Sequence, residues 1–187
     1  MTLHTSRRNP GPAKAGENRT ALLAAGRRVF REQGYRAPFS AVAKEAGVSQ
    51  AVLYRHFPDR RSLALEVFVE NFDAMERIAT SDTGPDAFFA VWRQFVEDAI
   101  ESAAIIEFVV TEGVDVPDEL GALRVDEVFG IPLARAQMAG RADPEWTVPD
   151  IMLIARMLYG AVSAQPDQES ARLAAARALT LIDPRLA

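Results

Sequence analysis

The sequence predicts an all-α protein in which short N-terminal helices precede a bundle of longer ones, and three observations support this prediction. Apolar residues recur at helical spacing along almost the whole chain. Glycine and proline interrupt this pattern at points where helices end. The chain has no hairpin signal and no repeat of roughly 20 to 50 residues. We expect about nine helices in total.

The first element is expected to be a disordered basic arm, because residues 1–16 are polar and rich in Pro and Gly. A helix is predicted over residues 17–33, where apolar residues share a face and Gly34 follows as a C-terminal cap. These apolar residues are Leu22, Leu23, Ala25, Val29 and Phe30.

Two short helices are predicted next. The first covers residues 40–46 and stops at Gly47, where the chain must turn with a positive φ. The second covers residues 50–57, begins after Ser49 as an N-cap, and ends before Pro58.

A long helix is expected from Asp59, a second N-cap, to about residue 79. Its apolar side is predicted to contain Leu63, Val67, Phe68, Phe72, Met75 and Ile78. An aromatic-rich helix follows over residues 88–100.

The apolar run 103–111 fits a strand or a buried helix by period alone, and we assign it as helix because no other strand exists to pair with it. Residues 118–141 look helical, with a weak point at Gly130–Pro132. Two more helices are predicted at 148–164 and 168–182. Small residues in both would allow close helix approach, within one chain or between two.

Charge is divided unevenly along the chain, although the net charge is only −5. Residues 1–61 contain 12 Lys and Arg against 4 Asp and Glu, whereas residues 62–187 contain 9 against 22. A basic end on an acidic body is typical of a polyanion-binding part joined to a part with another role. A merely solvated basic tail is the alternative.

The composition excludes several kinds of chemistry. The absence of cysteine excludes disulfides, thiolate metal sites and a cysteine nucleophile. The two histidines, His4 and His56, lie in different segments, so we expect no metal site, no cofactor and no catalytic residues. An all-α enzyme working from carboxylates such as Glu107 and Glu112 is a rival hypothesis, but nothing in the sequence fixes their geometry.

No apolar run reaches the roughly 20 residues that a membrane span needs, and the first residues lack a signal-peptide core. We therefore expect a soluble cytoplasmic protein with no membrane partner.

Residues 17–57 meet the requirements of a helix-turn-helix motif. Ala43 is small where the helix at 50–57 must approach, and Gly47 allows the turn. Leu53 and Phe57 are predicted to point inward, which turns Gln50, Ala51, Tyr54 and Arg55 outward.

This outward face suits a DNA major groove, because Gln pairs with adenine, Arg with guanine, and an alanine methyl with a thymine methyl. Tyr54, His56 and Arg60 are expected to contact phosphates, assisted by free amides near Asp59–Ser62. The full set of predicted DNA-binding residues is Lys44, Ser49, Gln50, Ala51, Tyr54, Arg55, His56 and Arg60.

The stretch from Leu22 to Leu63 resembles the N-terminal domain of TetR-family transcriptional regulators. The resemblance rests on the Phe-x-x-x-Gly-Tyr end of the first helix, on Ala-Gly-Val-Ser, and on Leu-Tyr-x-His-Phe followed by a polar cap and a basic residue. Gly26, Pro38 and Arg60 depart from the usual residues of that family.

The resemblance implies a two-domain chain: the arm 1–16, a helix-turn-helix domain 17–62, a linking helix and loop 63–84, and a ligand-binding and dimerisation domain 85–187. It further implies a homodimer formed by the helices at 148–164 and 168–182. The expected function is a regulator, most simply a repressor, that binds a palindromic operator in double-stranded DNA and is released by a small-molecule effector. The alternative is a helical small-molecule-binding module with only nonspecific DNA binding.

Aromatic and methionine side chains of the second half are candidates for an effector cavity, although ordinary core packing is the better explanation for any single one of them. Glu107 is a further candidate because its neighbours are apolar. The predicted effector-binding residues are Phe72, Trp92, Phe95, Glu107, Phe108, Phe129, Met138 and Met152.

Overall fold

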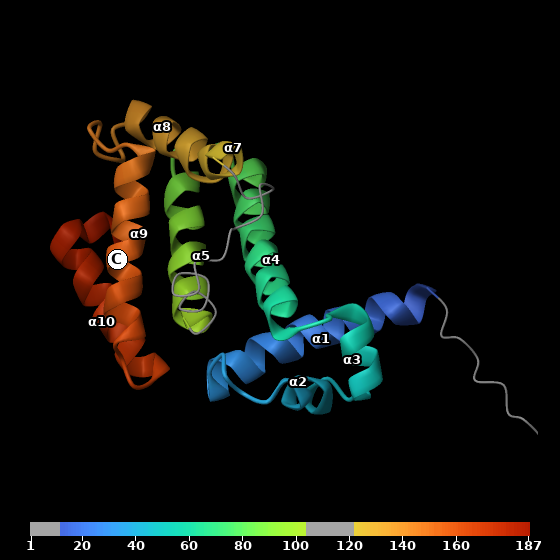
Figure 1. Ribbon diagram of the computed structural model, residues 1–187. Coiled ribbons are helices and arrows are strands. Elements are labelled where there is room, and N and C mark those ends of the chain that lie inside the picture. The colour runs from blue at the N-terminus through green and yellow to red at the C-terminus, as the bar shows by residue number, and fades with distance from the viewer. Residues whose placement is uncertain (1–11, 104–121) are drawn as a thin grey trace, which may run out of the picture.

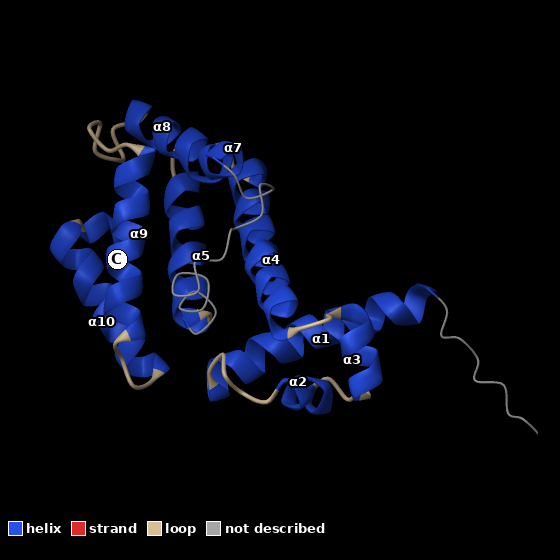
Figure 2. Ribbon diagram, viewed as in Figure 1, coloured by secondary structure: helices blue, strands red, loops and turns tan. Residues whose placement is uncertain are grey.

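The computed structural model describes residues 12–103 and 122–187 (Figure 1). Within these ranges the chain consists of helices and connecting segments without any strand, as Figure 2 shows. The all-α prediction is therefore confirmed, and the expected number of about nine helices is close to what these ranges contain. No helix in the described part is long and apolar enough to cross a membrane.

Three helices form the N-terminal part: α1 (Pro12–Gln33), α2 (Phe39–Glu45) and α3 (Gln50–His56). The predicted start of the first helix at residue 17 is wrong, because residues 12–16 belong to α1 rather than to the arm. Proline is tolerated at a first helical position, and the Ala-Lys-Ala that follows favours helix. Residues 1–11 lie outside the described residues.

The N-terminal helices enclose a core of their own, which we call the N-terminal cluster. Its buried members are Leu22, Leu23, Ala25, Val29, Phe30, Ala37, Val42, Ala43, Leu53, Phe57, Leu63, Ala64 and Val67. Gly47 has φ +67° between α2 and α3, and the amide of Val48 donates to the carbonyl of Ala43 at 3.0 Å. The turn that was predicted from Gly47 is therefore confirmed.

Helix α4 (Arg60–Ser81) runs from the N-terminal helices into the rest of the molecule, and α5 (Ala87–Glu101) returns beside it (Figure 1). The buried residues of α4 are Leu63, Ala64, Val67, Asn71, Met75 and Ala79. Leu63, Val67 and Met75 of the predicted apolar side are buried, whereas Phe68, Phe72 and Ile78 are only partly buried. The prediction left out Ala64, Asn71 and Ala79, which are buried, because it followed the large apolar side chains.

The C-terminal part consists of short segments followed by two long helices. These are α7 (Ala122–Val125), a π-helical turn η2 (Asp126–Gly130), α8 (Ile131–Met138), α9 (Val148–Ser163), α10 (Gln168–Ile182) and the 3-10 turn η3 (Pro184–Leu186). The boundaries at 148 and at 168–182 agree with the prediction. The weak point expected before Pro132 is the π-helical turn, and α8 ends at Met138, not at residue 141. The run 103–111 lies outside the described residues from residue 104 onward.

A second core, the C-terminal cluster, gathers buried side chains of α4, α5, η2, α8, α9, α10 and η3. Trp92 is its largest buried side chain, and its indole Nε1 donates to the carbonyl oxygen of Leu186 at 3.1 Å. Because α4 contributes to both clusters, it joins the two parts of the molecule. The domain boundaries at residues 62 and 84 stay predictions.

Candidate nucleic-acid interface

Helix α3 is fixed at both ends and from beneath. The Ser49 hydroxyl accepts from the amide of Val52 at 3.4 Å, which confirms the predicted N-cap. Leu53 is fully buried, and the amide of Phe57 donates to its carbonyl at 2.8 Å, closing the helix before Pro58. A short helix held in this way presents its outer side chains in a defined direction.

The outer face of α3 carries Gln50, Ala51 and Arg55, predicted for base contact, and Tyr54, predicted for phosphate contact. Gln50, Ala51, Tyr54 and Arg55 are all exposed. Tyr54 is 52% exposed, and its ring meets that of Phe39 edge-on, with the centroids 5.5 Å apart. This contact between α2 and α3 restricts the tyrosine while leaving much of it open to a ligand.

Three more predicted residues lie around this face. Lys44 is exposed near the end of α2, and Ser49 is exposed although its hydroxyl serves as a cap. His56 is half-buried in the last turn of α3. Their contacts with DNA stay predictions.

Arg60 is placed differently from the expected phosphate contact. Its Nη2 donates to the carbonyl oxygen of Ala37 at 2.6 Å, and its guanidinium lies over the Tyr35 ring, 5.4 Å from the centroid. The side chain therefore ties the start of α4 to the turn between α1 and α2. The neighbouring Arg61 is exposed and is the more accessible cation at this helix start.

The amides at the start of α4 are not simply available to an anion. The Asp59 carboxylate accepts from the amide of Ser62 at 2.7 Å, and the Ser62 hydroxyl lies within reach of the Asp59 amide at 3.4 Å. This capping box confirms the second predicted N-cap. It also weakens the expected role of these amides in phosphate binding.

The predicted effector residues are scattered, and several of them pack in the core. Trp92 stacks on Phe95 with centroids 5.3 Å apart, and Phe95 meets Phe129 edge-on at 6.0 Å. Phe72 and Met152 pack against this cluster from its edge. Met138 is 83% exposed at the end of α8 and lies apart from these aromatic contacts, and its role in effector binding stays a prediction. Glu107 and Phe108 lie outside the described residues.

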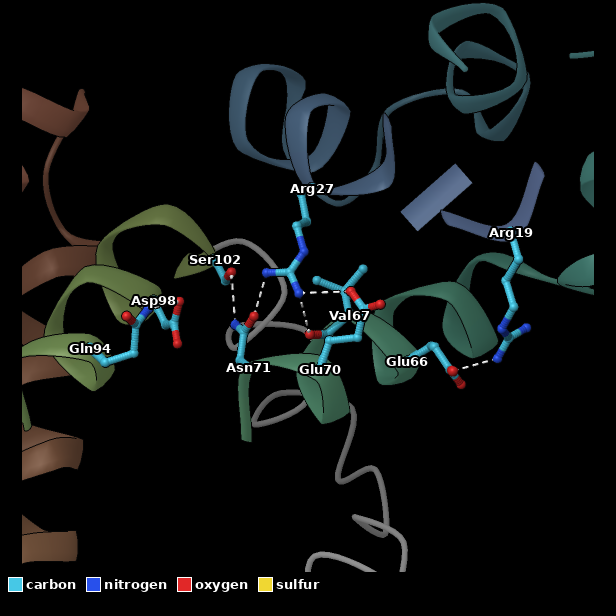
Figure 3. A network of polar contacts seen from close by, with 9 residues as sticks. All are labelled: Arg19, Arg27, Glu66, Val67, Glu70, Asn71, Gln94, Asp98 and Ser102. Carbon is cyan, nitrogen blue, oxygen red and sulfur yellow. Dashed lines mark hydrogen bonds and ion pairs between the residues drawn. The ribbon is translucent and has the colours of Figure 1, made fainter. Parts of the chain in front are cut away.

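Sequence reasoning missed a polar joint between α1, α4 and α5 (Figure 3). Arg27 of α1 donates to the side-chain oxygen of Asn71 and to Glu70 at 2.9 Å, both on α4. Asn71 in turn donates to the hydroxyl of Ser102, just after α5, at 3.4 Å. The signal that could have revealed this joint is Asn71, a polar residue among the apolar positions of α4.

Asp98 lies in an open cleft of about 500 Å³ beside this joint, lined by residues of α1, α4 and α5. Burial raises the pKa of Asp98 to about 6, against the opposing effects of a hydrogen bond from Gln94 and the charge of Arg27. Its Oδ1 accepts from Gln94 at 3.1 Å, whereas its Oδ2 is buried and has no hydrogen-bond partner in the described structure. A poorly solvated carboxylate therefore lies beside the joint.

Comparison with known proteins agrees with the arrangement of α1, α2 and α3. The sequence model of bacterial regulatory proteins of the tetR family matches residues 22–67. No curated protein sequence matches the chain. The helix-turn-helix domain of this chain therefore belongs to the TetR family, which acts in transcription regulation through DNA binding.

Solved structures extend the similarity beyond that domain. A TetR transcriptional regulator from Streptomyces coelicolor is 27% identical with a TM-score of 0.64, covering 88% of this chain and 95% of the other. A TetR transcription regulatory protein from Mycobacterium vanbaalenii is 26% identical with a TM-score of 0.57, covering 79% and 96%. The structure of RolR in complex with resorcinol shares the fold at 18% identity and a TM-score of 0.50, covering 94% of each chain.

Proposed function

We propose that this protein is a sequence-specific transcriptional regulator, most simply a repressor, that binds a palindromic operator as a homodimer and releases it when a small molecule binds. The main support is the outer face of α3, where Gln50, Ala51, Tyr54 and Arg55 are exposed. The helix itself is capped by Ser49 and anchored by the buried Leu53. Side chains of these types read base edges and methyl groups in the major groove.

The charge distribution supports the assignment of α3 as the DNA-facing element. Exposed cations lie on the segments that precede and follow it in the chain, namely Arg36, Lys44 and Arg61. The remainder of the chain, residues 62–187, is acidic and is repelled by phosphates. DNA is therefore directed to the basic end alone.

Apolar exposure supports a dimer formed by α9 and α10. Most of the large exposed apolar side chains in the described residues lie on these two helices: Leu153, Met157, Leu173, Leu181 and Ile182. A Cβ at Gly160 of α9 would meet no atom of the described structure within 4 Å. Such a face suits a second copy of the chain, and a two-fold dimer would present two α3 helices to a palindrome.

The proposal also includes release of the DNA when a small molecule binds. The support is the aromatic content of the C-terminal cluster, together with the resorcinol complex of RolR, which shows a small aromatic ligand on this fold in that protein. An effector that binds more tightly to a state with wrongly spaced α3 helices would lower operator affinity by the same coupling energy.

Arg55→Ala tests the role of α3. On the duplex that the wild type selects, we expect a loss of about 1 to 3 kcal/mol and a relaxed preference at one position of each half-site. Arg93→Ala, which removes an exposed arginine of α5 instead, serves as the control and should leave binding unchanged. An equal loss on all sequences would place Arg55 among phosphate contacts, and no loss would contradict the proposal.

A further inference from the structure

The described residues contain two buried polar side chains, Asn71 and Ser102, each only 6% exposed. They belong to one hydrogen-bonded chain, in which Arg27 donates to Asn71 and Asn71 donates to Ser102 at 3.4 Å (Figure 3). This series of hydrogen bonds begins on α1, passes through α4 and ends just after α5. It therefore spans from the N-terminal cluster to the C-terminal one.

Arg27 is held by several acceptors at once. Besides Asn71, its guanidinium donates to the Glu70 carboxylate at 2.9 Å and reaches the carbonyl oxygen of Val67 at 3.5 Å. A planar guanidinium that meets several acceptors fixes an orientation as well as a distance. The packing between Gly26 of α1 and Leu63 of α4 is apolar and less directional.

Stability alone does not explain an asparagine at position 71. Its neighbours on the buried side of α4 include Val67 and Met75, which are apolar. Replacing a buried polar group and its contacts by a well-packed apolar side chain is often neutral or stabilising. A buried polar group that is retained at such a site can instead serve to fix one arrangement of the packed elements.

The angle at this joint has a large effect on the position of α3. Arg27 lies 15 residues, about 22 Å, from Pro12 at one end of α1 and 6 residues, about 9 Å, from Gln33 at the other, so the two ends of α1 lie on average about 15 Å from the joint. A rotation of about 10° would move such a point by about 3 Å, close to the 3.4 Å rise of one base pair. Two protomers would add their displacements.

We infer that the Arg27–Asn71–Ser102 chain sets the orientation of the helix-turn-helix on the rest of the protein, and thereby the half-site spacing that the dimer accepts. Arg27 and Asn71 are positioning residues, which act on DNA through the placement of α3. The part of this inference that concerns half-site spacing rests on the proposed dimeric function. The part that concerns orientation does not.

Distance measurement between two spin labels tests the orientation without DNA. The chain has no cysteine, so Ser40→Cys on α2 and Ala134→Cys on α8, both at exposed positions, provide unique attachment sites. Labelled protein is diluted with unlabelled protein so that only distances within one protomer are recorded. The label pair is then compared in the wild type and in Asn71→Leu.

We expect Asn71→Leu to keep its thermal midpoint while the label distance shifts or broadens by about 3 Å, the displacement worked out above. Arg19→Ala is the matched control, because Arg19 pairs with Glu66 of α4 and lies over the Phe57 ring, 5.1 Å from its centroid, with no contact to α5 in the described structure. It should leave the distance unchanged. If Asn71→Leu does not fold, Arg27→Lys decides instead, since an ammonium group keeps the charge but lacks the planar fork.

An unchanged, narrow distance in the folded variant overturns the inference, and so does an equal broadening in Arg19→Ala. The spacing is tested on palindromes with lengthened and shortened spacers. Asn71→Leu should keep half-site affinity within about twofold and lose at least about tenfold on the wild-type spacing. If the wild type selects no palindrome, the proposed function fails, whereas the label distances still decide the orientation.

Discussion

Gly26→Ala gives a prediction in which two effects of known size oppose each other. Glycine inside α1 is less favourable than alanine by about 1 kcal/mol, so propensity alone predicts stabilisation. A Cβ at position 26, however, would lie 3.0 Å from Leu63 Cδ2 and 3.2 Å from Leu63 Cγ. Leu63 is fully buried in the N-terminal cluster and has little room to move.

Overpacking of this kind raises the free energy of the folded state by about 1 to 3 kcal/mol. The sum predicts that Gly26→Ala destabilises the protein by up to about 2 kcal/mol. Gly16→Ala in the same helix is the matched control, because a Cβ there meets no atom of the described structure within 4 Å. It should stabilise the protein by up to about 1 kcal/mol.

Urea unfolding measures both effects as changes in midpoint at constant slope. Adding Leu63→Val to Gly26→Ala should relieve the contact, so that the double variant loses less stability than the two single changes together predict. The reasoning is refuted if Gly26→Ala stabilises the protein as much as Gly16→Ala does. In that case the close approach of α1 to α4 does not require glycine.

Three further predictions concern charge and assembly. The pKa of Asp98 rises from 3.8 to about 6, so the folded protein binds this proton more tightly, and the destabilisation by the ionised carboxylate grows from about pH 4 and levels off above about pH 6. The stability of Asp98→Asn relative to the wild type should therefore rise between pH 4 and pH 7, by about 1 to 2 kcal/mol after solvent screening. Urea unfolding of both proteins at several pH values measures this, and a stability difference that does not change with pH contradicts it. Arg60→Ala loses the hydrogen bond to the carbonyl of Ala37 and should destabilise the fold by about 1 to 3 kcal/mol. Arg61→Ala should leave stability unchanged and should reduce the slope of log affinity for DNA against log salt concentration by about one unit per subunit. The reverse pattern would restore Arg60 as the phosphate contact. Leu173→Asp, at a position 69% exposed on α10, should give a folded monomer in sedimentation equilibrium, and a persisting dimer would place the interface elsewhere.

Local signals in the sequence predicted the helix-turn-helix well. Ser49 and Asp59 cap α3 and α4 as expected, and Gly47 has the positive φ that the turn requires. Such features depend on a few neighbouring residues, whose hydroxyl, carboxylate or missing Cβ acts within one helical turn. The buried Leu53 and the exposed Arg55 follow from helical periodicity alone.

Features that depend on distant segments were not predicted. Arg60 appeared free in the sequence, but it meets the carbonyl of Ala37 across a turn that the sequence does not place. Asn71 finds Arg27 on another helix, 44 positions earlier in the chain. Met138 looked like a core residue by type, yet it stands at a helix end where no neighbour covers it in the described structure. Periodicity identifies the face of a helix and not the partner that reaches it.

The most direct test of the central claim is selection of the purified protein against a random duplex DNA library at near-physiological salt, followed by sequencing of the retained duplexes. We expect a two-fold-symmetric consensus with half-sites about one helical turn apart, since two α3 helices of a dimer would read adjacent major grooves. Retention without any consensus, with affinity governed by salt alone, would contradict it and would leave a basic module that binds DNA nonspecifically.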